Sequence, residues 1–167
     1  MKLSEICDIL KAEVITGDDL MDTIITGGGG ADSINAGLGA DTLKFTRAQL
    51  AGVSSVGGGG GTDTVLLTAA TTALVDADFA NFSSVETLQL ANGANTIVLG
   101  TIAKNTAGIT TIVLGNDNTS ITLNDGVAMT IDASALPDGQ TLTIAGNGNF
   151  TITGRIDIPK LNAAGTR

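Results

Sequence analysis

The sequence has no histidine, tryptophan or tyrosine, and among its 167 residues it has only one cysteine, two prolines and four phenylalanines. Without histidine there is no Ser-His-Asp or Cys-His arrangement for nucleophilic catalysis, and zinc would lack its commonest ligand. The single cysteine, Cys7, excludes an internal disulfide. We therefore expect a protein that is not an enzyme.

One group of acidic residues is compatible with a catalytic alternative. Asp76, Asp78 and Glu86 cluster in the sequence, and glycosidases use paired carboxylates. Acids that flank a strand are, however, more often solvated than catalytic, and we expect these three to be solvated.

Basic residues are also scarce, with 8 Lys and Arg against 17 Asp and Glu and a net charge of −9. This acidity argues against binding to nucleic acid or to anionic membranes. No apolar run is long enough to cross a bilayer. The opening residues 1–8 also lack the continuous apolar stretch of a secretory leader.

Glycine is abundant, with 23 residues, and many of them fall into a nine-residue pattern. The segments 27–35, 36–44 and 58–66 read as GGxGxDxUx, where U is a large aliphatic residue. Glycines permit the sharp turn that brings several carbonyls toward one point, and the aspartate adds a hard oxygen of the kind Ca²⁺ prefers. The candidate metal-site residues are Asp22, Gly27, Gly28, Gly30, Asp32, Gly37, Gly39, Asp41, Gly58, Gly59, Gly61 and Asp63.

This pattern resembles the calcium-binding repeats of the repeats-in-toxin (RTX) family. The resemblance implies a parallel β-roll in which successive repeats lie on opposite sides and repeats two apart share an ion. On that rule Asp22 would face Asp41, and Asp32 would face Asp63 if the segment 45–57 loops out. The expected cofactor is one or two Ca²⁺ ions.

The alternative is a flexible glycine-rich linker, which is what such tracts usually form. The aspartates and aliphatic residues recur in phase with the glycines, and a linker has no reason for that phase. Within the segment 45–57, which separates the second and third repeats, Thr46 and Gln49 form a Thr-x-x-Gln capping pattern that predicts one short helical turn.

After residue 68 the glycine pattern fades, but short strand patterns continue. The segment 96–100 recurs as 111–115, and alternating apolar and polar residues follow to residue 153. The favoured fold is all-β, a right-handed parallel β-roll continued by a β-solenoid. The competing fold is an antiparallel sandwich, because Asn-Gly and Asp-Gly pairs of hairpin type separate the strands.

Residues 3–14 place apolar side chains on one helical face and predict a helix that caps the solenoid. Residues 2–22 also resemble the opening of DRTGG-domain proteins, from which no function is carried over. The expected divisions are a capping helix at 1–16, a calcium-binding roll at 17–66 with an insertion at 45–57, an irregular solenoid at 67–154 and a tail at 155–167.

Two functions follow from the RTX resemblance. The first is a calcium-dependent structural or adhesive module of a secreted or cell-surface bacterial protein, with cell-surface or self-association contacts. The alternative is the non-catalytic accessory segment of an exported enzyme or toxin. Both imply an extracellular location, reached by type I secretion.

Overall fold

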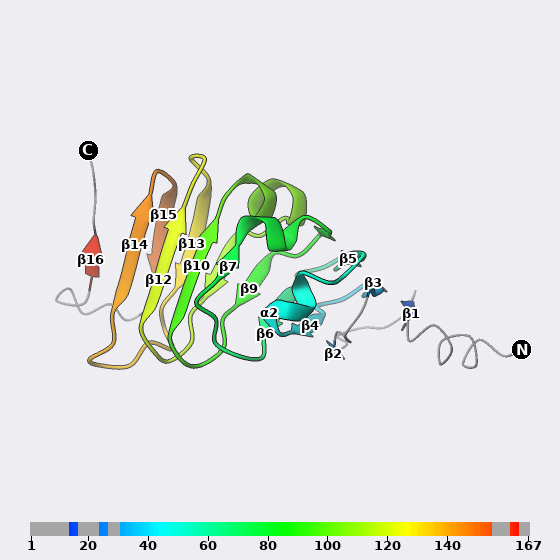
Figure 1. Ribbon diagram of the computed structural model, residues 1–167, viewed down its shortest axis with the longest axis horizontal. Coiled ribbons are helices and arrows are strands. Elements are labelled where there is room, and N and C mark those ends of the chain that lie inside the picture. Colours follow the sequence, from blue (N-terminus) through cyan, green and yellow to red (C-terminus); the bar gives the residue numbers. More distant parts are fainter. Residues whose placement is uncertain (1–13, 17–23, 27–30, 155–160, 164–167) are drawn as a thin grey trace, which may run out of the picture.

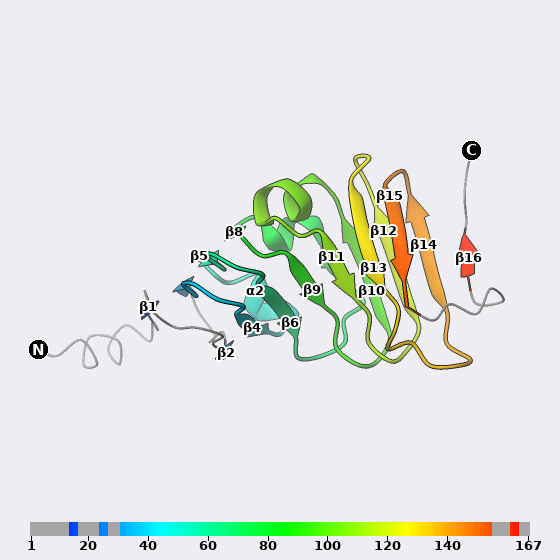
Figure 2. The ribbon, with the colours of Figure 1, turned by 180° about the vertical axis from the view of Figure 1, so that it is seen from behind.

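The computed structural model describes residues 14–16, 24–26, 31–154 and 161–163, and these residues form a mostly β structure with few helices (Figures 1 and 2). Every strand pair among them is parallel. The antiparallel sandwich is therefore wrong for this part of the chain. The expected capping helix lies outside the described residues.

The strands form three parallel sheets. The long sheet has seven strands, β2 (Ile24–Thr26), β4 (Thr42–Phe45), β6 (Thr64–Leu67), β9 (Thr87–Gln89), β11 (Thr111–Val113), β13 (Ala128–Asp132) and β15 (Asn149–Thr153). The first short sheet has four strands, β1 (Val14–Thr16), β3 (Ser33–Asn35), β5 (Ser55–Gly57) and β8 (Phe82–Ser83). The second short sheet has five, β7 (Leu74–Val75), β10 (Asn95–Leu99), β12 (Thr119–Leu123), β14 (Leu142–Gly146) and β16 (Leu161–Ala163).

The chain returns to the long sheet once in every coil, which is our name for one pass through the long sheet and a short sheet. Up to β6 the other strand of each coil belongs to the first short sheet, and from β10 onward it belongs to the second. Between β6 and β9 the chain visits both short sheets, through β7 and β8. The long sheet is therefore the element common to all coils (Figure 1).

The Asn-Gly and Asp-Gly pairs do form tight turns, but those turns join different sheets. Asp125 and Gly126 both have positive φ, 57° and 66°. They connect β12 of the second short sheet to β13 of the long sheet. A hairpin turn and a turn between sheets use the same residue types, so the dipeptides could not distinguish the two folds.

Strands of the long sheet are in register, so that equivalent residues of successive coils lie above one another. The inward column is aliphatic and consists of Ile25, Leu43, Val65, Leu88, Ile112, Ile131 and Ile152. From β4 onward the preceding outward column is threonine, at Thr42, Thr64, Thr87, Thr111, Thr130 and Thr151. Threonine suits such half-exposed strand positions because its branched side chain packs on the pleated surface.

The core is continuous from Ile25 to Ile144. Leu43, Val65 and Leu88 are each 0% exposed, and full burial of a side chain of this size stabilises the fold by about 1.5–3 kcal/mol. Phe82 packs edge-on against Phe45 and Phe79, with both ring centroids 5.7 Å away. Three of the four phenylalanines thus fill the core where the chain changes from one short sheet to the other.

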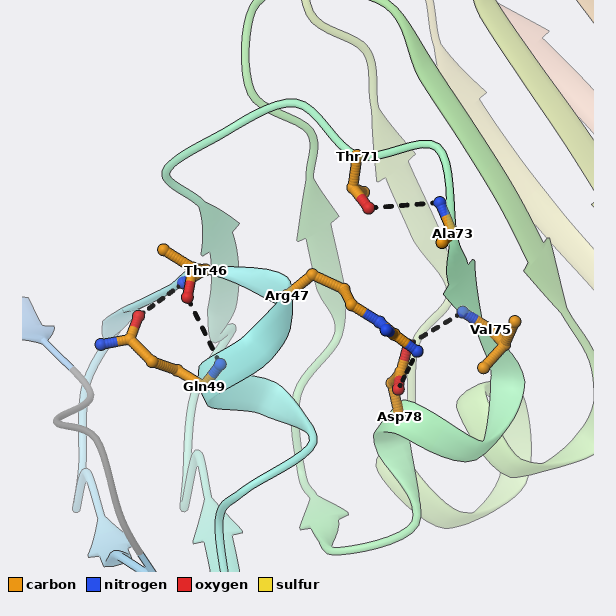
Figure 3. A network of polar contacts seen from close by, with 7 residues as sticks. All are labelled: Thr46, Arg47, Gln49, Thr71, Ala73, Val75 and Asp78. Carbon is orange, nitrogen blue, oxygen red and sulfur yellow. Dashed lines mark hydrogen bonds and ion pairs between the residues drawn. The ribbon is translucent and has the colours of Figure 1, made fainter.

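The predicted helical turn is confirmed as α2 (Arg47–Leu50), and Figure 3 shows its cap. The Thr46 hydroxyl accepts a hydrogen bond from the Gln49 backbone N–H at 3.3 Å, and the Thr46 N–H donates to Gln49 Oε1 at 2.7 Å. The expectation that all of 45–57 loops out was wrong. Ser55–Gly57 is strand β5, which pairs with β3 through Val56 and Ile34.

Two short helical segments lie near the change from one short sheet to the other. The first, η1 (Asp76–Phe79), joins β7 to β8, and the second, η2 (Ile102–Ala107), joins β10 to β11. Asp78 of η1 binds Arg47 of α2 through two hydrogen bonds, at 3.0 Å to Nε and 3.1 Å to Nη2. Asp78 also accepts the Val75 backbone N–H at 3.0 Å (Figure 3). Its side chain is 6% exposed, whereas that of Arg47 is 39% exposed.

We expect Asp78→Ala to lower the free energy of unfolding by about 2–3 kcal/mol, because it removes three hydrogen bonds that involve charged groups. The half-exposed guanidinium adds little further attraction, because water screens it. Asp117, whose carboxylate accepts only the adjacent Asn118 N–H at 2.6 Å, is the control, and Asp117→Ala should change stability by less than about 0.5 kcal/mol. Urea unfolding measures both values. Equal losses of unfolding free energy in the two variants would contradict a stabilising role for the Asp78 hydrogen bonds.

Candidate functional site

Two glycine-containing loops, 36–41 and 58–63, carry the site. Each has positive φ at the second and fourth positions of the motif, at Gly37 and Gly39 in one loop and at Gly59 and Gly61 in the other. A Cβ on Gly59 or Gly61 would overlap the carbonyl oxygen of the loop beneath. Only glycine satisfies both the positive φ and this close approach.

The two loops stack directly on one another. The Gly39 N–H donates to the Gly60 carbonyl oxygen and the Gly60 N–H donates to the Gly37 carbonyl oxygen, both at 2.8 Å. Leu38 and Gly60 form an isolated parallel bridge at the same place. Each loop leads from the first short sheet into the long sheet, so the aspartates that end the loops lie on neighbouring coils.

These aspartates begin a column of acids that also includes Glu86. The Asp41 backbone N–H donates to Asp63 Oδ1 at 2.8 Å. In the next coil the Asp63 N–H donates to Glu86 Oε2, also at 2.8 Å. The column ends at Thr110, whose N–H donates to the Glu86 carbonyl oxygen at 2.9 Å. Asp63 and Glu86 thus each accept a backbone hydrogen bond from the coil before.

Some of the buried carboxylates have an oxygen atom that accepts no hydrogen bond. Asp32, Asp41 and Asp63 are 3%, 1% and 0% exposed. The Oδ2 atoms of Asp32 and Asp63 are buried and accept no hydrogen bond. The single ion pair among the described residues is Arg47–Asp78, so no cationic side chain neutralises Asp63 or Glu86. A buried carboxylate oxygen of this kind is costly without a positive partner.

Burial raises the pKa of the Asp63 carboxyl above its ordinary value of 3.8. The Asp41 N–H opposes this rise by stabilising the ionised form, while the negative charges of Asp41 and Glu86 add to it. The charge of Asp63 is therefore disfavoured in the folded protein. A bound cation would reverse that balance.

The structure places Asp63 beside Asp41, so the expected pairing of Asp32 with Asp63 was wrong. The physical reason is β5. It pairs with β3, the strand that directly follows Asp32, and so occupies the neighbouring position in the first short sheet. Ser54 and Ser55 donate their N–H groups to the Asp32 carbonyl oxygen at 2.9 and 3.2 Å. A serine, not an aspartate, therefore stands next to Asp32.

The remaining predicted residues are placed only in part. Asp22, Gly27, Gly28 and Gly30 lie outside the described residues. Gly58 is buried in the second loop, where a Cβ on this residue would overlap the Asp63 side chain. If Asp22 is the aspartate of a nine-residue repeat, the aliphatic position two residues later is Ile24. In β2, however, it is Ile25 that is in register with Leu43.

Sequence reasoning missed Glu86 as a member of this column, although a signal was present. Asp41, Asp63 and Glu86 each stand two residues before the inward aliphatic residue, at Leu43, Val65 and Leu88. The loop before Glu86 has no glycine, so a search for the complete nine-residue motif passes over it. The acid-x-aliphatic spacing alone would have found it.

Asp76 and Asp78, the two acids that cluster with Glu86 in the sequence, have other roles. The Asp76 carboxylate accepts backbone N–H groups from Gly100, Ile102 and Ala103 at 2.7–3.0 Å and so satisfies the start of η2. Asp78 binds Arg47. The expectation that all three acids are solvated is wrong for Asp78, which is buried.

In the described part of the chain, no three His, Cys, Asp or Glu side chains lie close enough together to hold one metal ion. An ion at the stacked loops would therefore need backbone carbonyls in addition to Asp41 and Asp63. Such all-oxygen ligand sets are what Ca²⁺ uses.

Comparisons with protein-family models, with curated proteins and with solved structures found no match to this chain. Within the residues described, no helix has both the length and the apolar character needed to cross a membrane. The site must therefore be interpreted from its own geometry.

We expect Asp63→Asn to raise the melting temperature in metal-free buffer at pH 7. The raised pKa of Asp63 means that its contribution to stability is lost as the pH rises through that pKa, and the neutral amide avoids this loss. Below the ordinary value of 3.8 both states bind the proton, so the difference should vanish. Thermal unfolding from pH 3.5 to 8 tests this, and a variant that melts below the wild type at pH 7 would contradict it.

Proposed function

We propose that the protein is a calcium-binding module of the RTX type, with a right-handed parallel β-solenoid fold. One observation carries the proposal. Two glycine loops of the same conformation stack so that their terminal aspartates, Asp41 and Asp63, lie on adjacent coils, where both are buried. A polar linker would have no reason to bury two carboxylates together.

The residues that would hold the ion are Asp41, Asp63 and carbonyl groups of the loops 36–41 and 58–63. These groups fit Ca²⁺ because they are all hard oxygens and because buried Asp63 Oδ2 accepts no hydrogen bond. When bound, Ca²⁺ would supply the positive charge that Asp63 lacks among the described residues. The chain itself orients the ligands through the positive-φ glycines and the Asp41–Asp63 hydrogen bond.

Right-handed coiling is inferred from the parallel strand connections, which are almost always right-handed in proteins. The continuous apolar core of the described residues after residue 68 supports a structural or adhesive role, because stacked coils that share one core form a rigid body. The net charge of −9 favours folding where calcium is abundant. In line with the resemblance to RTX proteins, we propose a location outside the cell, as a secreted or cell-surface module exported by type I secretion.

We expect calcium to raise the melting temperature of the wild type. A site with a Kd of roughly 10⁻⁴ M contributes about 2.7 kcal/mol at a hundredfold excess of ligand over Kd. For a chain of this size that corresponds to a rise of roughly 5–10 °C. Melting curves in chelator and in 10 mM Ca²⁺ measure the shift, and identical curves would refute the proposal.

Asp41→Asn should lose most of this calcium-dependent shift, because it removes one of the two carboxylates at the stacked loops. Asp117→Asn is the matched control, since it makes the same charge change far from the loops and should keep the full shift. If instead Asp117→Asn lost the shift and Asp41→Asn kept it, the ion site would have to lie elsewhere.

A further inference from the structure

Two asparagine–glycine pairs of this chain, Asn92–Gly93 and Asn147–Gly148, lie in turns that join different sheets. Asparagine is a thermolabile residue, because the backbone nitrogen of the next residue can attack its side-chain carbonyl carbon. Glycine favours this attack, since it has no Cβ to obstruct the approach and permits unusual backbone angles. Both asparagine side chains are exposed. The difference between the two pairs therefore lies in their hydrogen bonds.

The pair Asn147–Gly148 is held at both of the groups that would react. The Gly148 N–H donates to the Leu123 carbonyl oxygen at 2.8 Å. Asn147 Oδ1 accepts the Gly126 N–H at 3.3 Å. A Cβ on Gly148 would overlap the Leu123 side chain, so this glycine packs closely against the coil before it. The attacking nitrogen and the carbonyl that it would attack are thus both bonded to the neighbouring coil.

The pair Asn92–Gly93 is held differently. The Gly93 N–H has only a long hydrogen bond, of 3.4 Å, to exposed Asn116 Oδ1. No hydrogen bond within the described part of the chain holds the Asn92 side chain. The turn is closed instead by Asn95, whose Nδ2 donates to the Ala91 and Gly93 carbonyl oxygens at 2.9 and 2.7 Å. The two reacting groups are therefore the least restrained part of this turn.

We propose that Asn92 is a site of spontaneous deamidation in the folded protein and that Asn147 is protected. The Gly93 nitrogen forms a bond to Asn92 Cγ, and its proton leaves together with the side-chain nitrogen as ammonia. Water then opens the resulting five-membered succinimide ring at one of its two carbonyl carbons. The products are aspartate and isoaspartate, in which the main chain runs through the former side chain. Water is the only co-reactant, and nothing is oxidised or reduced.

Both products change the turn that precedes β10. Each adds a negative charge to a protein that is already acidic. Isoaspartate also adds one carbon to the main chain between the Ala91 and Gly93 carbonyl groups, which Asn95 Nδ2 binds together. Asn95 is 2% exposed, and its Oδ1 accepts the Thr71 N–H at 3.1 Å. The lengthened turn separates the two carbonyl groups, so it loosens the contact of Asn95 with the neighbouring coil.

Trypsin places the two pairs on different peptides, residues 48–104 and 105–155, because no lysine or arginine lies within either segment before its last residue. The folded full chain is incubated in Ca²⁺ at mildly alkaline pH, and tandem mass spectrometry of the peptides locates each deamidation. We expect Asn92 to react roughly tenfold faster than Asn147, because reaction at Asn147 must first break two hydrogen bonds, each of which slows it several-fold. Equal rates, or a faster reaction at Asn147, would overturn the proposal.

The unfolded chain in guanidinium chloride separates the effect of the fold from that of the sequence. Both pairs lose their hydrogen bonds there, so the two rates should become similar. A preference for Asn92 that persisted in denaturant would refute protection by the fold. Asn92→Gln should remove the fast reaction, because glutamine would have to close a six-membered ring, and should leave the rate at Asn147 unchanged. Fast deamidation that remained in peptide 48–104 of this variant would place the reaction at another asparagine and refute the assignment.

Discussion

The in-register stacking of the long sheet is the constraint on which the rest of the molecule depends. Because each strand pairs with its equivalent one coil later, any residue type that recurs in the sequence becomes a column in space. Leu43, Val65 and Leu88 form such a column inside the core. The threonines that precede them form another on the outside. The hydrogen bonds between coils are satisfied by the same alignment.

The same alignment also stacks like charges, which no isolated strand would do. Asp41, Asp63 and Glu86 are brought together because each stands two residues before an inward aliphatic residue, and the aliphatic residues must align to close the core. The hydrophobic core therefore holds the carboxylates in place against their repulsion. The packing of the fold therefore determines where these negative charges gather.

Much of the architecture was predictable from local signals, and the exceptions have identifiable causes. Parallel pairing followed from the resemblance to RTX repeats, whereas the glycine loops and the Thr46–Gln49 cap followed from spacing and turn chemistry. Strand β5 was missed because Ser55, Val56 and Gly57 resemble the start of a glycine tract, and only its pairing with β3 identifies it. That one strand moved Asp63 to the side of Asp41. The contact of Asp63 with Glu86 depends on this shift and is invisible to motif matching.

Each coil closes over a short stretch of chain, and this has a kinetic consequence. Asp41 and Asp63 are 22 residues apart, and Asp63 and Glu86 are 23 apart. Parallel sheets usually fold slowly because their partners are distant in sequence, but here the entropic cost of loop closure is small and nearly equal for every coil. Formation of any one coil gives its neighbours a template, so the structure can grow outward from a local nucleus in the manner of repeat proteins. Speed of assembly is thus built into the spacing of the repeats.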